Sequence, residues 1–228
     1  MTRSAGRGVL ITGGARGIGL AIADAFREQG DKVVALSSAD GDLSDPAAVA
    51  EIVADAVKSL GGIDVLVNNA AAILASPLPE STYENWQQTW RRTLDVNVFG
   101  AANMSYCVAQ HMIARGSGRI VNVGSRGAFR GEPNHPAYGA SKAALHSLGQ
   151  SLAISLAPHG IAVASVAPGF VETERVGPML TDAVRAQSPF GRVAKPDEIA
   201  AAVLYLASPA AEWASGAVLD LNGASYLR

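Results

Sequence analysis

The chain has 228 residues, of which 49% are hydrophobic, so it can bury one large core without dividing into several domains. Its 18 basic and 20 acidic residues give a formal net charge of -2, and no basic run indicates binding to nucleic acid or to an anionic membrane. The single cysteine excludes an internal disulfide and fits a reducing compartment, and the 4 histidines lack the spacing of metal ligands. The opening MTRSAGRG precedes too short an apolar run for a signal peptide, and no run approaches the ~20 apolar residues of a membrane span. We therefore expect one soluble, cytoplasmic domain over residues 1–228 that binds no metal.

Short runs rich in valine and isoleucine alternate with helical patterns along the chain, which is typical of a parallel sheet covered on both faces. The predicted strands are 9–11, 33–36, 65–67, 120–123, 163–166 and 218–221. The helix after the second strand has clear ends: Asp45 or Ser44 as its N-cap, Pro46 in its first turn, and Gly61 and Gly62 beyond its last residue. The pattern predicts an α/β fold, a Rossmann-like doubly wound parallel sheet with helices on both faces.

The interval between the second strand and the next helix is short. Fewer than ten residues separate Ser37 from Pro46. A parallel neighbouring strand requires a crossover of about a dozen residues or more. We therefore expect the sheet to be abbreviated at its edge after the second strand.

The first predicted strand runs into the glycine-rich stretch T-G-x-x-x-G-x-G at residues 12–19. A helix that begins after such a strand presents unpaired N–H groups and the positive end of its dipole, which together bind anions. Gly13, Gly17 and Gly19 then serve as the turn, the phosphate approach and the close helix contact of a dinucleotide site. A tight turn without a ligand is the alternative.

Tyr138 and Lys142 stand four residues apart on a predicted helix, so their side chains share one face. The phenol has a pKa near 10 in water, and a neighbouring ammonium should lower it. The pair can then donate or accept a proton near neutral pH, although an ordinary exposed pair has the same spacing.

Several further motifs follow in order: Asn68-Asn69-Ala70-Ala71, Asn97 within LDVNVFG, Ser125 after IVNV, Tyr138-Gly-Ala-Ser-Lys142, and Pro168-Gly169 before Thr173. Together with the glycine turn, they identify the chain as resembling the short-chain dehydrogenase/reductase family from Val9 to about Ala224, and in particular its 3-oxoacyl-acyl-carrier-protein reductase-like members. The resemblance implies a dinucleotide-binding catalytic domain that transfers a hydride between a nicotinamide and a small-molecule carbonyl or secondary alcohol. It assigns Tyr138 as general acid and base beside Lys142, Ser125 to the substrate oxygen, and Asn97 to a water that relays the proton.

The resemblance also implies a set of cofactor contacts. They are Gly13, Arg16, Gly17, Ile18, Gly19, Ser37, Ser38, Asp42, Leu43, Asn69, Ala70, Tyr138, Lys142, Pro168, Gly169, Val171 and Thr173. Relatives that prefer NAD usually carry an acidic residue where this chain has Ser37, and Arg16 stands where a base can reach a 2′-phosphate. NADP(H) is therefore favoured, with NAD(H) possible if Asp40 takes the acidic role.

The substrate pocket should form from residues after Ser125, from the loop 133–137, and from the segment 170–192. Arg126, Arg130, His135 and Arg175 could bind an anionic substrate there, although solvated surface is the simpler interpretation of each. By resemblance, the alanine-rich helices 97–114 and 137–156 should pair between subunits in a homotetramer, or else in a dimer. Two alternatives to the oxidoreductase stay open: a catalytically silent NADP-binding sensor, and a dehydratase or epimerase of the same fold.

Overall fold

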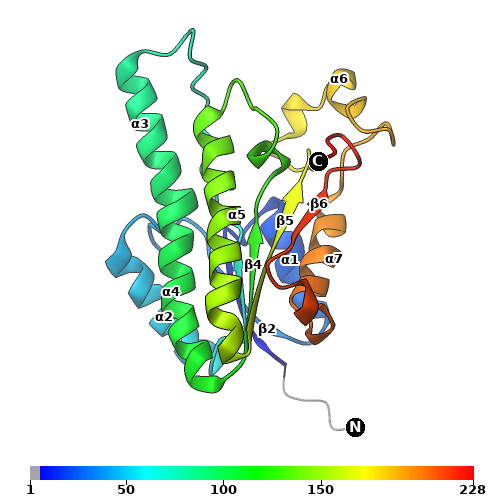
Figure 1. The fold of residues 1–228 in the computed structure, drawn as a ribbon. Helices are drawn as coiled ribbons and strands as arrows, with labels where there is room; N and C mark the ends of the chain where they lie inside the picture. The colour runs from blue at the N-terminus through cyan, green and yellow to red at the C-terminus, as the bar shows by residue number, and fades with distance from the viewer. Residues whose placement is uncertain (1–5) are drawn as a thin grey trace.

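Six parallel strands form one sheet in the order β2-β1-β3-β4-β5-β6 in the computed structural model, which describes residues 6–228 (Figure 1). The strands are β1 (Gly8–Thr12), β2 (Lys32–Ala35), β3 (Val65–Asn68), β4 (Gly118–Val123), β5 (Ile161–Pro168) and β6 (Val218–Leu221). All six predicted strands are confirmed. Residues 1–5, part of the stretch expected to carry no signal peptide, lie outside the described residues.

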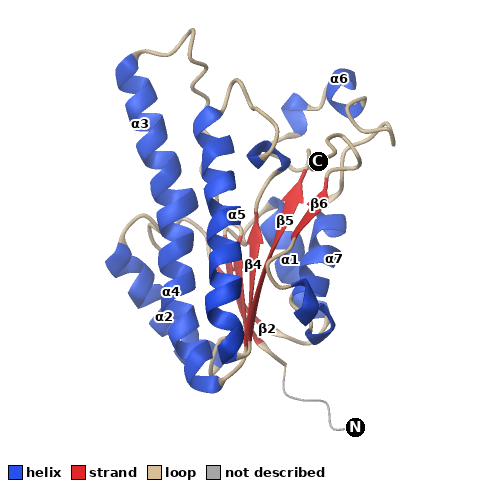
Figure 2. Ribbon diagram, in the orientation of Figure 1, coloured by secondary structure: helices blue, strands red, loops and turns tan. Residues whose placement is uncertain are grey.

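Helices cover both faces of this sheet (Figure 2). On one face are α1 (Gly17–Glu28) and α7 (Pro196–Leu206), and on the other are α2 (Pro46–Leu60), α4 (Ala101–Arg115) and α5 (Pro136–Leu156). The predicted doubly wound fold is confirmed. Buried Phe26 and Val203 pack in the first layer, and buried Val53, Met104 and Leu156 pack in the second. Within residues 6–228, no helix has the length and apolar character that crossing a membrane requires.

Helix α2 forms where its capping signals predict it. The Asp45 side chain accepts a hydrogen bond of 2.9 Å from the Ala47 N–H, and Pro46 opens the first turn. Gly61 ends the helix with φ 76°, a left-handed conformation that glycine adopts without steric cost.

The abbreviated edge is also confirmed. Residues 36–45 contain neither helix nor strand, so β2 is the edge strand on this side of the sheet. The chain passes from β2 to α2 directly over the carboxyl edge of the sheet, where the glycine turn also lies.

The carboxyl ends of the strands point to the top of Figure 1, where the short helices and loops gather. Helix α3 (Tyr83–Leu94) rises on one side of this edge, and α6 (Asp182–Arg185) lies above β5 and β6 on the other. Ligands of open α/β sheets bind at this end of the strands.

Candidate active site

The glycine turn follows β1 at the carboxyl edge. Gly13 and Gly17 have φ values of 66° and 54°, which favour glycine. A Cβ at Gly19 would lie 2.1 Å from the carbonyl oxygen of Gly13, so the start of α1 comes too close to the turn for any side chain. This cradle, which a Cβ would fill, fits a dinucleotide pyrophosphate at the helix N-terminus.

Thr12 and Asn69 join the glycine turn to the end of β3. The Thr12 hydroxyl accepts hydrogen bonds from the backbone N–H groups of Asn69 (3.0 Å) and Ala70 (3.1 Å). In return, the Asn69 amide donates to the Gly13 carbonyl at 2.9 Å. Sequence reasoning assigned no role to Thr12, although it stands in the quoted motif, because its partners lie 57 and 58 residues away.

The end of β2 carries Ser37 in place of an acidic residue, and the sequence left Asp40 as the residue that could take the acidic role. The structure brings Asp40 beside Ser37: its carboxylate accepts hydrogen bonds from the Ser37 backbone N–H (2.7 Å) and hydroxyl (2.8 Å), because the short connection folds back on itself. These bonds, the backbone one first, lower the pKa of Asp40 below its usual value. Arg16 is exposed within the glycine turn, as the N-cap of α1, and Ser38 is exposed as well.

The other proposed cofactor contacts surround the same edge. The Asp42 carboxylate is held by Arg92 at 3.0 Å, so it is already paired, and Leu43 lies under the Gly100 backbone. Ile18 is half-buried at the start of α1.

The segment after β5 faces the glycine turn. A Cβ at Gly17 would lie 3.3 Å from Cγ2 of Thr173, so these two positions are brought together across the chain. Pro168 ends β5 opposite Leu221, and the Gly169 N–H donates to the Leu221 carbonyl at 3.1 Å. The Val171 side chain is buried in the core, so only its backbone can face a cofactor.

Tyr138 and Lys142 lie on one face of α5, as their spacing predicts, with the Lys142 ammonium 5.7 Å from the centre of the Tyr138 ring. The ammonium is buried and donates to the Val123 carbonyl at 2.7 Å, and burial lowers the pKa of Lys142 to about 8. Burial also raises the pKa of Tyr138, and a hydrogen bond with Ser125 opposes that rise. The sequence predicted that Lys142 lowers the pKa of Tyr138, but in the protein alone this pKa is raised, because desolvation of the phenol outweighs the hydrogen bond with Ser125.

Asn97 contacts α5 next to Lys142, through a hydrogen bond with Ser141. It lies in a π-helical segment, Asp95–Gly100, that joins α3 to α4; such segments are frequent at functional sites. The buried Asn97 amide donates to the Ser141 hydroxyl at 2.9 Å and to the Ala72 carbonyl at 3.0 Å. Ser141, the neighbour of Lys142, is thus a site residue that sequence reasoning missed.

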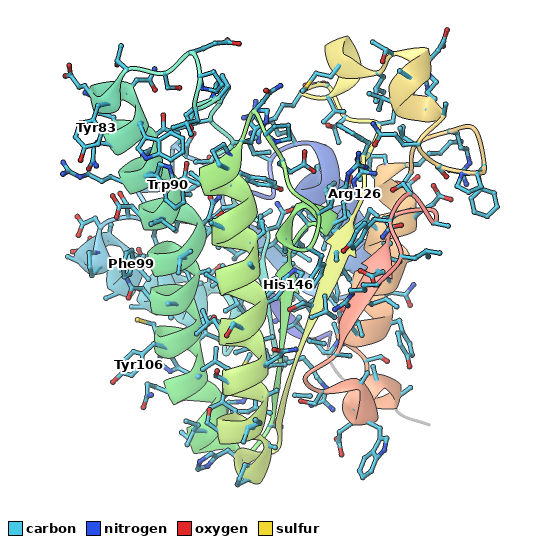
Figure 3. The ribbon with its side chains drawn as sticks, turned by 45° about the horizontal axis from the view of Figure 1, so that its top comes forward. Tyr83, Trp90, Phe99, Tyr106, Arg126 and His146 are labelled. Carbon is cyan, nitrogen blue, oxygen red and sulfur yellow. The ribbon has the colours of Figure 1, made fainter. Side chains whose placement is uncertain are left out.

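His146 lies one further turn along α5 from Lys142, between this helix and the sheet (Figure 3). Its side chain is only 4% exposed and packs on Phe129 with ring centres 5.1 Å apart. Within the described part of the chain, neither ring nitrogen has a hydrogen-bond partner. Burial, with the charges of Lys142 and Arg228, lowers the pKa of His146 to about 4.

This burial predicts acid sensitivity. Between the ordinary pKa of about 6.5 and the native value of about 4, the unfolded chain binds a proton that the folded chain does not, so stability falls as pH drops. From about pH 7 to about pH 4.5, the wild type should lose on the order of 2 kcal/mol more unfolding free energy than His146→Leu. Urea unfolding at each pH measures the unfolding free energies of the wild type and of His146→Leu. The control is His111→Leu at an exposed position, which should lose as much unfolding free energy as the wild type. Parallel curves for wild type and His146→Leu would contradict a neutral native imidazole.

A cavity of about 320 Å³ lies where β5 and β6 end, and its lining includes none of Asn97, Ser125, Tyr138 and Lys142. Its lining includes Arg126, which follows Ser125, and Phe170, Val184, Gln187, Ser188, Phe190 and Arg192 from the predicted 170–192 segment. Residues beyond that segment, among them Asn222, Gly223 and Ser225, also line the cavity and were not predicted. The described lining includes no residue of the loop 133–137. Of the four candidate anion-binding residues, Arg126 is buried, Arg130 and His135 are half-buried, and Arg175 is exposed.

A doubly wound sheet with a glycine turn after its first strand, at the carboxyl edge, defines the class of dinucleotide-binding proteins. The residues around the turn fit this class.

Comparisons with known proteins narrow the class. Residues 35–223 match the family model described as enoyl-(acyl carrier protein) reductase. The 3-oxoacyl-[acyl-carrier-protein] reductase FabG of Vibrio cholerae serotype O1 is 32% identical over an alignment of 243 positions, gaps included, that covers 97% of this chain and 98% of that protein. The crystal structure of 3-ketoacyl-(acyl-carrier-protein) reductase from Brucella melitensis complexed with NADH has a TM-score of 0.90 at 31% identity, covering 97% of this chain and 99% of that one. ElxO with NADP bound has a TM-score of 0.88 at 27% identity, covering 96% and 98%.

The chain therefore belongs to the short-chain dehydrogenase/reductase family, as the motifs indicated. It is an oxidoreductase that uses a nicotinamide cofactor.

Proposed function

We propose that the protein transfers a hydride between the nicotinamide and the carbonyl or carbinol carbon of a small molecule, with Tyr138 as general acid and base. The observation that carries this proposal is the contact of Tyr138 with both Ser125 and the buried Lys142 at the carboxyl end of β4. Residues 1–228 are proposed to act as one catalytic domain.

The bound cofactor would supply the hydride donor or acceptor, and the chain's own groups manage the proton. In reduction, Ser125 holds the substrate oxygen beside the phenol, and Tyr138 donates its proton to that oxygen as the carbon receives the hydride. A raised pKa keeps Tyr138 protonated until this step, which suits a proton donor. Lys142 stabilises the phenolate that remains, and Asn97 holds the relay that returns the proton from solvent.

The cofactor would lie across the carboxyl edge of the sheet. Gly13, Gly17 and Gly19 would hold its pyrophosphate, the Asn69–Ala70 turn one ribose, and Thr173 the nicotinamide side. These assignments are supported by the close approach of the glycine turn to Asn69 and Thr173.

We propose NADP(H) as the preferred form, because exposed Arg16 and the exposed Ser38 hydroxyl suit a 2′-phosphate. The Asp40 carboxylate opposes this preference, since it adds a negative charge at Ser37. The substitution Asp40→Asn should therefore raise affinity for NADPH about tenfold relative to NADH.

Thermal shift with NADPH and NADH, side by side, tests both the function and the preference. A ligand at about 100 times its Kd should stabilise the fold by ~2.7 kcal/mol. A shift with neither cofactor would contradict the function. A larger shift with NADH in the wild type would contradict only the preference and assign Asp40 to the ribose hydroxyls. The control variant is Asp24→Asn, which removes an exposed carboxylate on α1 that is paired with Arg27.

We also infer a homotetramer, or else a dimer, that pairs the outer faces of α4 and α5. Phe99, in the π-helical segment that leads into α4, is 56% exposed, Tyr106 on α4 is 68% exposed, and Ile154 on α5 is 80% exposed. Figure 3 shows Phe99 and Tyr106 at the outer side. Apolar side chains gathered on one face are typical of subunit contacts. Light scattering at micromolar concentration should give a multiple of the chain mass, and the triple variant Phe99→Ser, Tyr106→Ser, Ile154→Ser should lower it. A monomeric wild-type mass would contradict the inference.

A further inference from the structure

Arg126 is a buried cation directly after Ser125. Only 4% of it is exposed, and it lies at the carboxyl end of the sheet (Figure 3). Its guanidinium donates to the Gln187 amide oxygen at 2.6 Å and to the Ser225 hydroxyl. It also stacks over the Phe170 ring, 5.0 Å from the ring centre.

Arg130 also contacts the Gln187 side chain. Its guanidinium donates to the same Gln187 oxygen at 3.1 Å, so two cations share one neutral acceptor. Among residues 6–228, neither arginine forms an ion pair with a carboxylate, and Glu132 acts on Arg126 only at longer range. A guanidinium cannot neutralise itself by losing its proton at ordinary pH, so its burial without a counter-charge is costly.

The other charges on the cavity wall are already paired. Arg192 forms a bidentate ion pair with Glu198, with both N···O distances 2.7 Å. Asp220 forms an ion pair with Arg228 at 2.9 Å. Arg126 is therefore the lining cation whose charge has no partner among the described residues. The Gln187 amide oxygen occupies the position that one oxygen of a carboxylate would take between the two arginines.

We propose that this cavity binds the carboxylate of a small organic acid, held by Arg126 and Arg130 in place of the Gln187 amide. A carboxylate accepts paired hydrogen bonds from guanidinium groups and supplies the missing charge. Because Arg126, which lines the cavity, directly follows Ser125 in the chain, the occupant is assigned as an oxo- or hydroxy-acid substrate, a step that rests on the proposed function. The volume of about 320 Å³ suits a compound of that size.

Calorimetric titration of the full chain with benzoate, and with benzamide as its neutral analogue, tests the site. Benzoate should bind at least about tenfold more tightly than benzamide, and added salt should weaken it. The variant Arg126→Gln should abolish the difference. The variant Gln187→Glu keeps both arginines and supplies a carboxylate within the chain, so it should also lose benzoate binding and should raise the unfolding midpoint by about 3 °C.

Arg27→Gln is the control for the loss of one positive charge, because this arginine on α1 pairs with Asp24 and does not line the cavity, and the variant should bind benzoate like the wild type. Equal binding of benzoate and benzamide, or unchanged benzoate binding in Gln187→Glu, would overturn the site even if Arg126→Gln failed to fold.

A paired panel of oxo acids and their methyl esters, assayed by cofactor oxidation, tests the substrate assignment. The acids should be reduced with kcat/KM at least about tenfold higher than their esters, and Arg126→Gln should remove that ratio. Reduction of the esters alone would overturn the assignment. If nothing is reduced and neither cofactor shifts the melting temperature, the proposed reaction fails, and the benzoate titration still decides the carboxylate site.

Discussion

Tyr138→Phe is expected to lower the turnover number at least about 100-fold, while the Kd of the nicotinamide cofactor stays within about threefold of the wild-type value. The substitution removes one hydroxyl and keeps the ring beside the Lys142 ammonium, so packing at this point of α5 changes little. Without the hydroxyl, the substrate oxygen has no proton donor when the carbon receives the hydride. Steady-state kinetics with any reduced carbonyl compound and a cofactor titration measure the two quantities.

The matched control for this variant is Tyr83→Phe. Tyr83 is 78% exposed on α3, and among residues 6–228 its hydroxyl bonds with Gln87 of the same helix alone, from which it accepts a hydrogen bond. Its loss should leave turnover unchanged. Turnover in Tyr138→Phe within about tenfold of the wild type would remove Tyr138 from the proposed mechanism.

Local signals predicted most of the fold. Each buried strand is a short valine- and isoleucine-rich run, and the ends of α2 follow from Asp45, Pro46 and Gly61, whose effects extend over a few residues. The abbreviated edge of the sheet was predicted from the length of one connection alone, because too few residues separate β2 from α2 for another crossover.

Features that depend on distant contacts were not predicted. The π-helical segment forms where Asn97 bonds Ala72, 25 residues away, and Ser141, 44 residues away, and no local pattern encodes those partners. Likewise, Ser225 joins the cavity through Arg126, which lies 99 residues earlier. The direction of the Tyr138 pKa shift was wrong because the spacing to Lys142 is visible in the sequence, whereas the burial of the phenol is not.

The contact of Gly124 with His146 is another feature that depends on residues distant in sequence. Both residues were unremarkable in the sequence: one is a glycine after β4, the other a histidine on a long helix. In the structure, a Cβ at Gly124 would lie 1.7 Å from Nε2 of His146 and 2.6 Å from its Cδ2. The imidazole thus takes the space that a side chain at position 124 would need.

Gly124→Ala is therefore expected to lower the free energy of unfolding by about 3 kcal/mol, because the imidazole is enclosed and cannot move aside. The variant should also lose turnover, since Gly124 stands between Val123, whose carbonyl holds Lys142, and Ser125. Chemical unfolding and steady-state kinetics measure the two losses. Gly131→Ala is the control, because a Cβ there meets nothing within 4 Å, and its stability should match the wild type.

The double variant Gly124→Ala, His146→Ala distinguishes a clash from a general loss of backbone freedom. If the imidazole is the obstacle, removing it should make the two substitutions less than additive, with a coupling of at least about 1 kcal/mol in the favourable direction. Losses that simply add would show that Gly124 is required for its backbone and not for the space it leaves to His146.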